Sequence, residues 1–188
     1  VDITVEEMVG AMSTFANQGV YVKPNFIIKI EDKNGVVIDQ PMPVTKDVVN
    51  KDVAYAVIKL MEGVTQSGTG ARLKWGGGGF IQYDYSFGNP IAGKTGTSQN
   101  NSDGWFIGMV PNLAAGIWVG NEDRAAHFKS THMGQGATTA LPIWGMFMKK
   151  CYNDPALNVS KEEFKRPDNF AIKVDCWTPR KEIDSTAI

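Results

Sequence analysis

The sequence predicts an α+β fold in which an antiparallel β-sheet is covered by helices, and two observations support this. Two apolar runs near residues 105–110 and 113–119 are joined by turn residues, and they follow a strand-length segment around Lys94, within residues 90–98. Apolar residues at helical spacing recur earlier in the chain, near 5–16 and 50–64. Consecutive strands joined by tight turns pair antiparallel, so the helices are expected to cover an antiparallel meander.

Length and composition limit what the chain can be. Its 188 residues are enough for one domain with a hydrophobic core, and a net charge of -1 argues against a nucleic-acid partner. No apolar run is long enough to cross a bilayer. The sequence shows neither an initiator Met nor a signal peptide, so we expect a piece of a longer protein. Cys151 and Cys176 either pair in an oxidising compartment or remain separate thiols; both alternatives stay open.

The first predicted element is a helix over about residues 5–16. Thr4 and Glu7 have the spacing of a capping box, in which each side chain accepts from the other's backbone N–H. Gly19 suits the end of this helix. The apolar side chains at helical spacing are Val5, Met8, Val9, Met12, Phe15 and Ala16.

A hairpin and a second helix are expected next. Residues 26–30 and 36–38 flank Asn34-Gly35, a strong hairpin signal, and Pro41 ends the pairing. We expect this hairpin to pack away from the functional residues. A helix follows from about Asn50, with these residues predicted on its apolar face: Val53, Val57, Leu60, Met61 and Val64.

The central strands and the last helix complete the predicted fold. Pro111-Asn112 makes the turn between two apolar runs, and such continuous runs predict burial on both faces of the sheet. A helix is expected over about 138–150, with Pro142 tolerated in its first turn. His127 and His132 lie in a polar connection without a carboxylate or cysteine at a metal-ligand spacing, so no metal or cofactor is expected.

The chemistry is expected at Lys94-Thr95-Gly96-Thr97, which follows small apolar residues. On a strand the side chains alternate, so Lys94 and Gly96 point one way and Thr95 and Thr97 the other. Lys94 supplies a positive charge, the two hydroxyls can donate to an anion, and Gly96 leaves room for another backbone. The motif therefore favours binding an extended peptide that ends in a carboxylate.

A competing motif covers the same residues. Residues 88–95 also match the phosphate-binding loop, Gly-x-x-x-x-Gly-Lys-Thr, letter for letter. That motif requires a helix that starts at the Lys-Thr pair and binds phosphates at its N-terminus. The residues that follow, 96–104, lack apolar helical periodicity and contain two glycines and two asparagines. A nucleotide-binding loop is therefore the less favoured interpretation.

The Lys-Thr-Gly segment resembles the third signature motif of the penicillin-binding proteins and serine β-lactamases. The run DGWFIGMVPNLAAGIWVGNED that follows it resembles the strands after this motif in class A (bifunctional) penicillin-binding proteins. The segment TVEEMVGAMSTFANQGVYVKP near the start resembles the helix after their Ser-x-Asn motif. Gly68-Thr69-Gly70 is also similar to the family, although a tight turn is its favoured role. The resemblance covers about residues 1–176 and implies the C-terminal part of a transpeptidase domain.

The resemblance implies a role for each residue of the motif. Lys94 would place positive charge beside the substrate carboxylate and the proton-transfer network. The hydroxyls of Thr95 and Thr97 would bind that carboxylate, or the carboxylate of a β-lactam. Gly96 would let the substrate backbone approach, and the backbone N–H of Thr97 would be one of two oxyanion-hole donors.

The nucleophile of such an enzyme is missing from this sequence. The family's serine lies in Ser-x-x-Lys, but no serine here is followed by a lysine three residues later. Ser98-Gln99-Asn100 fits Ser-x-Asn, yet it directly follows the Lys-Thr-Gly strand instead of preceding it, so we interpret it as a coincidence. We therefore expect part of a peptidoglycan D,D-transpeptidase that is inactive alone. A non-catalytic peptide- or partner-binding module is the alternative.

Further expectations follow from class A membership. Residues 1–151 would be the C-terminal part of the transpeptidase domain, and residues 152–188 a partly ordered appendix. The parent would carry a glycosyltransferase domain and an N-terminal membrane anchor, and would work on the periplasmic face of the inner membrane. Its partners would be the D-Ala-D-Ala stem peptide of peptidoglycan, β-lactams and the missing N-terminal half of the domain. An exposed sheet edge also allows a homodimer.

Overall fold

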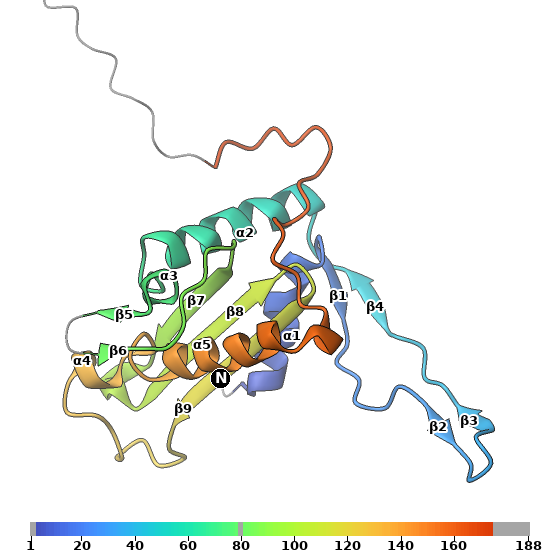
Figure 1. The fold of residues 1–188 in the computed structure, drawn as a ribbon, viewed down its shortest axis with the longest axis horizontal. Coiled ribbons are helices and arrows are strands. Elements are labelled where there is room, and N and C mark those ends of the chain that lie inside the picture. Colours follow the sequence, from blue (N-terminus) through green and yellow to red (C-terminus); the bar gives the residue numbers. More distant parts are fainter. Residues whose placement is uncertain (1–2, 79–80, 175–188) are drawn as a thin grey trace, which may run out of the picture.

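A computed structural model describes residues 3–78 and 81–174 and has the predicted α+β architecture (Figure 1). The helices are α1 (Val5–Ala16), α2 (Lys51–Gln66), α3 (Arg72–Trp75), α4 (Thr131–Gly134) and α5 (Ala140–Asn153), with short 3-10 helices η1 (Gln99–Asn101) and η2 (Pro155–Leu157). The strands are β1 (Val20–Val22), β2 (Ile30–Glu31), β3 (Val37–Asp39), β4 (Thr45–Asp47), β5 (Gly77–Gly78), β6 (Ile81–Gln82), β7 (Ala92–Thr97), β8 (Asp103–Val110) and β9 (Leu113–Gly120).

The central sheet is the predicted antiparallel meander, with the strand order β7-β8-β9. Ala92 lies opposite Met109 and Thr97 opposite Gly104, so β7 pairs with β8 along its whole length. The central strand β8 is mostly buried, as the apolar run predicted. Strand β9 is only half-buried. The prediction of burial on both faces was therefore wrong for β9, because it is an edge strand of the described sheet.

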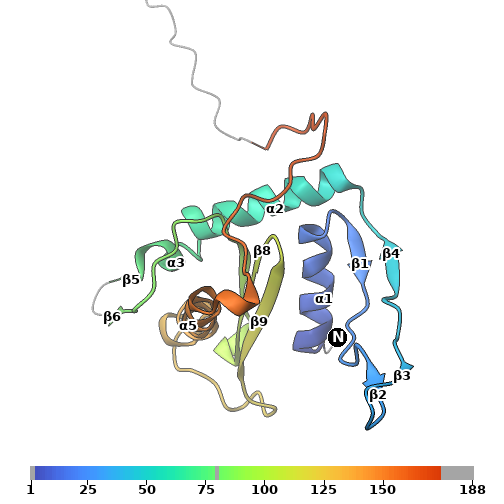
Figure 2. The same cartoon turned by 45° about the vertical axis from the view of Figure 1, so that its right-hand side comes forward.

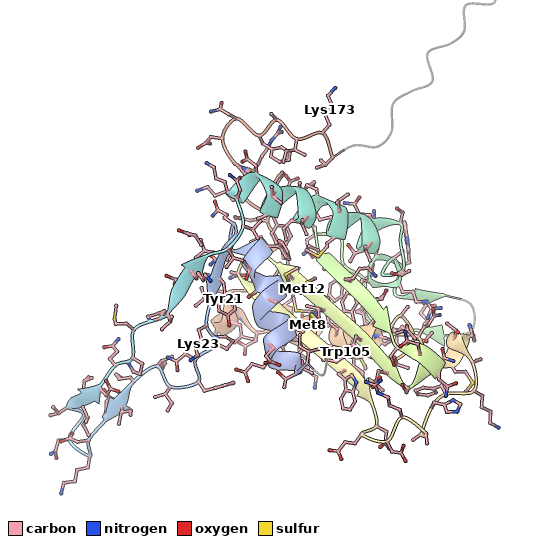
Figure 3. All side chains as sticks on the ribbon, turned by 180° about the vertical axis from the view of Figure 1, so that it is seen from behind. Met8, Met12, Tyr21, Lys23, Trp105 and Lys173 are labelled. Carbon is pink, nitrogen blue, oxygen red and sulfur yellow. The ribbon has the colours of Figure 1, made fainter. Side chains whose placement is uncertain are left out.

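Helices cover both faces of this sheet (Figures 1 and 2). Helix α2 packs along β7 and α1 packs against β9 on one face, whereas α5 crosses β8 and β9 on the other. Figure 3 shows the face with α1 and α2, with Met8 and Met12 on α1 and Trp105 on β8. The sheet is therefore the middle layer of three, and each face carries its own hydrophobic cluster.

Trp144 of α5 is the largest fully buried side chain of the described residues. Its ring packs edge-on against Phe106 at 5.3 Å and Phe87 at 6.4 Å between ring centroids. Its indole N–H donates to the carbonyl of Ala115 on β9 at 3.1 Å. A Cβ at Gly108 would lie 2.5 Å from the Trp144 ring, so the helix can approach the sheet only because this position lacks a side chain.

The first helix begins as predicted, because Thr4 and Glu7 form the capping box. The backbone N–H of Glu7 donates to the Thr4 hydroxyl at 3.1 Å, and the N–H of Thr4 donates to the Glu7 carboxylate at 2.9 Å. These bonds lower the pKa of the Glu7 carboxyl, chiefly through the Thr4 backbone N–H.

The second helix also begins at the predicted place, but its predicted buried face is wrong at two positions. Val53 is 46% exposed and Leu60 is 59% exposed. The buried stripe instead runs through Ala54, Ile58, Met61, Glu62 and Thr65. Two polar residues can be buried in this stripe because each has a partner, one on α2 itself and one just before β7. The Glu62 carboxylate pairs with Lys59, and the Thr65 hydroxyl donates to the carbonyl of Ile91, just before β7.

The predicted hairpin is strands β2 and β3, which form an arm that projects away from the sheet, at the opposite end from β7 (Figures 1 and 3). Asp32 builds its turn by accepting from the backbone N–H groups of Asn34 and Val36, and Gly35 adopts a positive φ of 82°. These backbone bonds lower the pKa of the Asp32 carboxyl. The pairing of β1 with β4 at the base of the arm was not predicted.

The described part of the predicted C-terminal appendix returns to α2. Phe164 is buried in the same cluster as Ile58 and Met61 of that helix. The ring of Phe170 packs edge-on against Tyr55 at 4.9 Å. Cys151 is buried in α5, whereas Cys176 and the rest of the appendix lie outside the described residues. The boundary at residue 152 therefore stays a prediction.

A polar cluster closes the turn between β7 and β8. The carboxylate of Asp103 accepts from the Ser98 hydroxyl at 2.6 Å, the Ser102 hydroxyl at 3.2 Å and the indole N–H of Trp118 at 3.0 Å. The Ser98 hydroxyl in turn accepts from the backbone N–H of Asp103 at 3.0 Å. These bonds, led by the one from Ser98, hold the pKa of the Asp103 carboxyl below its usual value. The cluster therefore fixes the end of β7.

We expect Trp144→Ala to lower the free energy of unfolding by about 3–5 kcal/mol, because it leaves a cavity at the centre of the α5 face. Equilibrium denaturation by urea measures this. Met146→Ala on the same helix is the control, since Met146 is 49% exposed, and it should cost less than about 1 kcal/mol. Equal decreases in the free energy of unfolding of the two variants would contradict the central place of Trp144 in the core.

The Asp103 cluster predicts a pH dependence of stability. A carboxyl whose folded-state pKa is lowered stabilises the fold above the ordinary Asp pKa of about 3.9, and this contribution disappears as the pH falls through the folded-state pKa. Asp103→Asn should therefore lower the melting temperature at pH 7, and its difference from the wild type should shrink as the pH falls below about 3.9. A constant difference across that range would show that the charge of Asp103 contributes nothing.

Candidate functional site

The predicted functional motif lies on β7, at an edge of the central sheet. Among the described residues, only β8 pairs with β7 in the central sheet. Thr97 lies opposite Gly104 at the end of the ladder, and the next residues continue its register, because the backbone N–H of Ser98 donates to the carbonyl of Asp103. Ser98 and Asp103 are therefore placed as a hydrogen-bonded pair. Such pairs alternate along antiparallel strands. The N–H and C=O groups of Thr95 and Thr97 therefore point away from β8, toward the open edge.

The side chains of β7 alternate between the two faces of the sheet. Ala92 packs with Ile58 and Met61 of α2, so Lys94, two residues further, lies on the same face. Lys94 is exposed, and its ammonium donates to the carbonyl of Thr95 at 2.9 Å. The positive charge is therefore placed directly at the open edge.

The hydroxyl of Thr95 meets a second hydroxyl from a distant part of the chain. Thr69 lies in the loop between α2 and α3, and its Oγ1 is 2.7 Å from Oγ1 of Thr95. The two residues are 26 positions apart, and the Thr69 side chain is exposed. The sequence favoured only a tight turn for Gly68-Thr69-Gly70. The paired glycines were the signal for that turn, but no pattern indicated which hydroxyl it would reach.

The hydroxyl of Thr97 contacts the loop that precedes α5. It accepts from the backbone N–H of Gly136 at 3.2 Å. Gly136 lies directly over the paired backbones of β7 and β8, since a Cβ there would be 2.2 Å from the Trp105 carbonyl oxygen and 2.5 Å from that of Gly96. Only a glycine allows this approach. No pattern in the sequence indicated this second contact from a loop.

Gly96 combines a close contact with an open position. A Cβ at Gly96 would be 3.1 Å from the Cβ of Trp105 on β8, which is tighter than usual packing. Gly96 is nonetheless half-exposed. A larger residue here would push against Trp105 or project from the Lys94 face of the edge strand.

The structure contradicts the phosphate-loop interpretation. Lys94 and Thr95 are in the middle of β7, where that motif requires the start of a helix. The next helical element is the short η1, which begins at Gln99 and contains Asn100 at a positive φ of 61°. No helix N-terminus is therefore available at Lys94 and Thr95 to bind a phosphate.

The remaining candidates lie away from the β7 edge or within the turn. Ser98 and Asn100, which fit Ser-x-Asn, belong to the turn that joins β7 to β8. His127 and His132 are exposed, and His132 lies in α4. Within residues 3–78 and 81–174, no three His, Cys, Asp or Glu side chains are grouped to bind a metal ion. The helices of this same part are too short or too polar to cross a membrane.

The arrangement can bind an extended chain that carries an anionic group. The edge of β7 offers outward backbone N–H and C=O groups, a cation from Lys94, and the hydroxyls of Thr69, Thr95 and Thr97. A peptide strand added to such an edge gains backbone hydrogen bonds. Within the described residues, no serine is followed by a lysine three positions later.

Comparison with known proteins supports one family. Residues 1–140 match the family model described as the penicillin binding protein transpeptidase domain. Penicillin-binding protein 1A of Aquifex aeolicus is 34% identical over 149 residues, which cover 79% of this chain and 19% of that protein. The Rickettsia typhi protein of the same name is 29% identical, with 100% of this chain and 25% of that protein covered. The chain thus spans only a fifth to a quarter of these relatives.

Solved structures share the fold. The penicillin-binding protein PonA1 from Mycobacterium tuberculosis matches with a TM-score of 0.73 and 25% identity, over 98% of this chain and 46% of that one. Penicillin-binding protein 1A from Haemophilus influenzae matches with a TM-score of 0.68 and 22% identity, over 81% of this chain and 27% of that one. The matched family model and the shared fold agree. This chain belongs to the penicillin-binding protein transpeptidase domain family.

Proposed function

We propose that this chain provides the Lys-Thr-Gly-Thr strand of a peptidoglycan D,D-transpeptidase, which cross-links cell-wall stem peptides through an acyl-serine intermediate. The observation that carries the proposal is the open edge of β7, where outward backbone groups of Thr95 and Thr97 lie beside the Lys94 ammonium. A substrate with an extended backbone and a C-terminal carboxylate complements this edge, since it offers both hydrogen-bonding groups and negative charge.

Each residue of the motif has a role in this proposal. Lys94 places its charge beside the substrate carboxylate and the proton-transfer network. Thr95 and Thr97 bind the carboxylate through their hydroxyls, and Gly96 leaves space for the substrate backbone. The outward N–H of Thr97 donates to the oxyanion that forms when the serine attacks the D-Ala-D-Ala carbonyl.

The proposal requires a nucleophile from elsewhere in a longer parent protein. The sequence contains no Ser-x-x-Lys, and the relatives are four to five times longer than the region matched. We propose that the parent supplies this motif, together with a glycosyltransferase domain and a membrane anchor, and works on the periplasmic side of the inner membrane. The isolated chain is then inactive. PonA1 is known in complex with penicillin V, and a β-lactam is the inhibitor class we propose for the parent.

The other edge of the central sheet, strand β9, is the proposed contact with the missing N-terminal half of the transpeptidase domain. Strand β9 is half-buried, and Trp118 on it is 38% exposed. An unpaired strand edge favours the addition of another strand. A second copy of this chain could add there instead. In that case the chain would be a non-catalytic binding module, which the absence of Ser-x-x-Lys from the sequence favours over a complete enzyme.

Reaction with a penicillin tests the proposal. The 188-residue chain should show no covalent adduct by intact-mass spectrometry, because it lacks the nucleophile. The same chain expressed together with the coding sequence that precedes it in its gene should be acylated. Lys94→Ala should then slow acylation by about 10²–10⁴-fold, whereas Lys150→Ala, at an exposed site on α5, should not. An adduct on the isolated chain, or unchanged acylation of the Lys94 variant, would refute the proposal.

The oxyanion role of Thr97 has its own test in the acylating protein. Thr97→Pro removes the outward N–H without breaking the β7–β8 ladder, and Thr97→Ala removes only the hydroxyl. The proline variant should acylate about 10²–10³-fold more slowly than the alanine variant. Melting temperatures of the two variants control for folding. Equal acylation rates would assign no oxyanion role to this N–H.

A further inference from the structure

We infer that Thr69 is a positioning residue, which orients the Thr95 hydroxyl to donate to the carboxylate of the bound peptide. This inference rests on the proposed function and extends it to a residue outside the Lys-Thr-Gly-Thr motif. The observation is the pair of exposed or half-exposed hydroxyls, 2.7 Å apart, from two segments that are distant in the sequence.

The chemistry of two adjacent hydroxyls gives Thr69 this role. Each threonine hydroxyl has one proton to donate and can also accept. When Thr69 donates to Thr95, the proton of Thr95 is free to donate to a third group. Hydrogen bonds in such a chain polarise one another, so the donor at its end is strengthened. A carboxylate accepts only, and it therefore matches the end of this chain better than a neutral amide does.

The backbone around Thr69 is fixed without help from its side chain. The N–H of Gly68 donates to the Gly63 carbonyl at 3.1 Å, and the N–H of Gly70 donates to the Val64 carbonyl at 2.9 Å. A Cβ at Gly68 would be 2.8 Å from the Cα of Val64, so this turn requires glycine there. The turn is thus held against the last residues of α2 by backbone hydrogen bonds. The Thr69 hydroxyl is not needed to hold the turn and is available to bond with Thr95.

The distance between this turn and β7 is fixed as well. Thr65, four residues before Thr69, is buried and donates from its hydroxyl to the carbonyl of Ile91, four residues before Thr95. The end of α2 is therefore attached to the start of β7. The backbone carbonyl of Thr95 accepts from the Lys94 ammonium. The hydroxyl and the outward backbone N–H of Thr95 are then the groups that remain to donate to a ligand.

The test compares two probes that differ only in their C-terminal group, N-acetyl-D-Ala-D-Ala with a carboxylate and its C-terminal amide with a neutral group that also donates. Each is titrated into the isotope-labelled 188-residue chain, and the amide signals of Thr95 and Thr97 give the dissociation constants. The wild type should prefer the acid. Thr69→Val should weaken binding of the acid by about tenfold and leave the amide unchanged, as expected for the loss of a hydrogen bond to a charged group. Thr69→Ser should restore the preference.

Controls separate this inference from the proposed function. Thr45→Val, an identical change at an exposed position on β4, should match the wild type. If the wild type prefers the acid and Thr69→Val keeps that preference, the inference is wrong while the proposed function stands. If the wild type binds neither probe, or both equally, the proposed function itself fails. If Thr69→Val weakens the binding of both probes, Thr69 has only a structural role, and this result would also refute the inference.

Discussion

The site depends on one constraint, which is that β7 pairs on one side only among the described strands. A strand in the middle of a sheet would use its N–H and C=O groups in both directions, and nothing would remain for a ligand. Here the pairing with β8 leaves the outward N–H groups of Thr95 and Thr97 available. The positive charge of Lys94 can attract an anionic ligand at this edge because the ammonium lies beside those groups.

An open edge must also be held rigid to be useful, and three contacts achieve this. The end of α2 is attached through Thr65 to the carbonyl before β7. The loop before α5 lies over the strand pair at Gly136, which donates to Thr97. The Asp103 cluster closes the turn after β7. The strand is thus fixed at its start, over its face and at its end, while its outer side stays open.

The two faces of the sheet contribute in different ways. On the face with α5, Trp144 fills the core and reaches β9 through its indole N–H. On the face with α2, a buried stripe includes Glu62 and Thr65, whose partners are polar. Burying such groups costs free energy unless each is satisfied, so their presence indicates that α2 is positioned by specific contacts as well as by apolar area.

The sequence by itself determined the fold class, the position of most major elements and the identity of the motif, because these depend on local patterns. Periodicity, the capping box of Thr4 and Glu7, and the turns at Asn34-Gly35 and Pro111-Asn112 all act between neighbours in the chain. Only the tertiary structure decided which face of α2 is buried and which strands are edges. It also decided that Thr69 and Gly136 meet the motif from 26 and 39 residues away. Such contacts depend on how the packed elements bring distant backbones together, and no local pattern records that geometry.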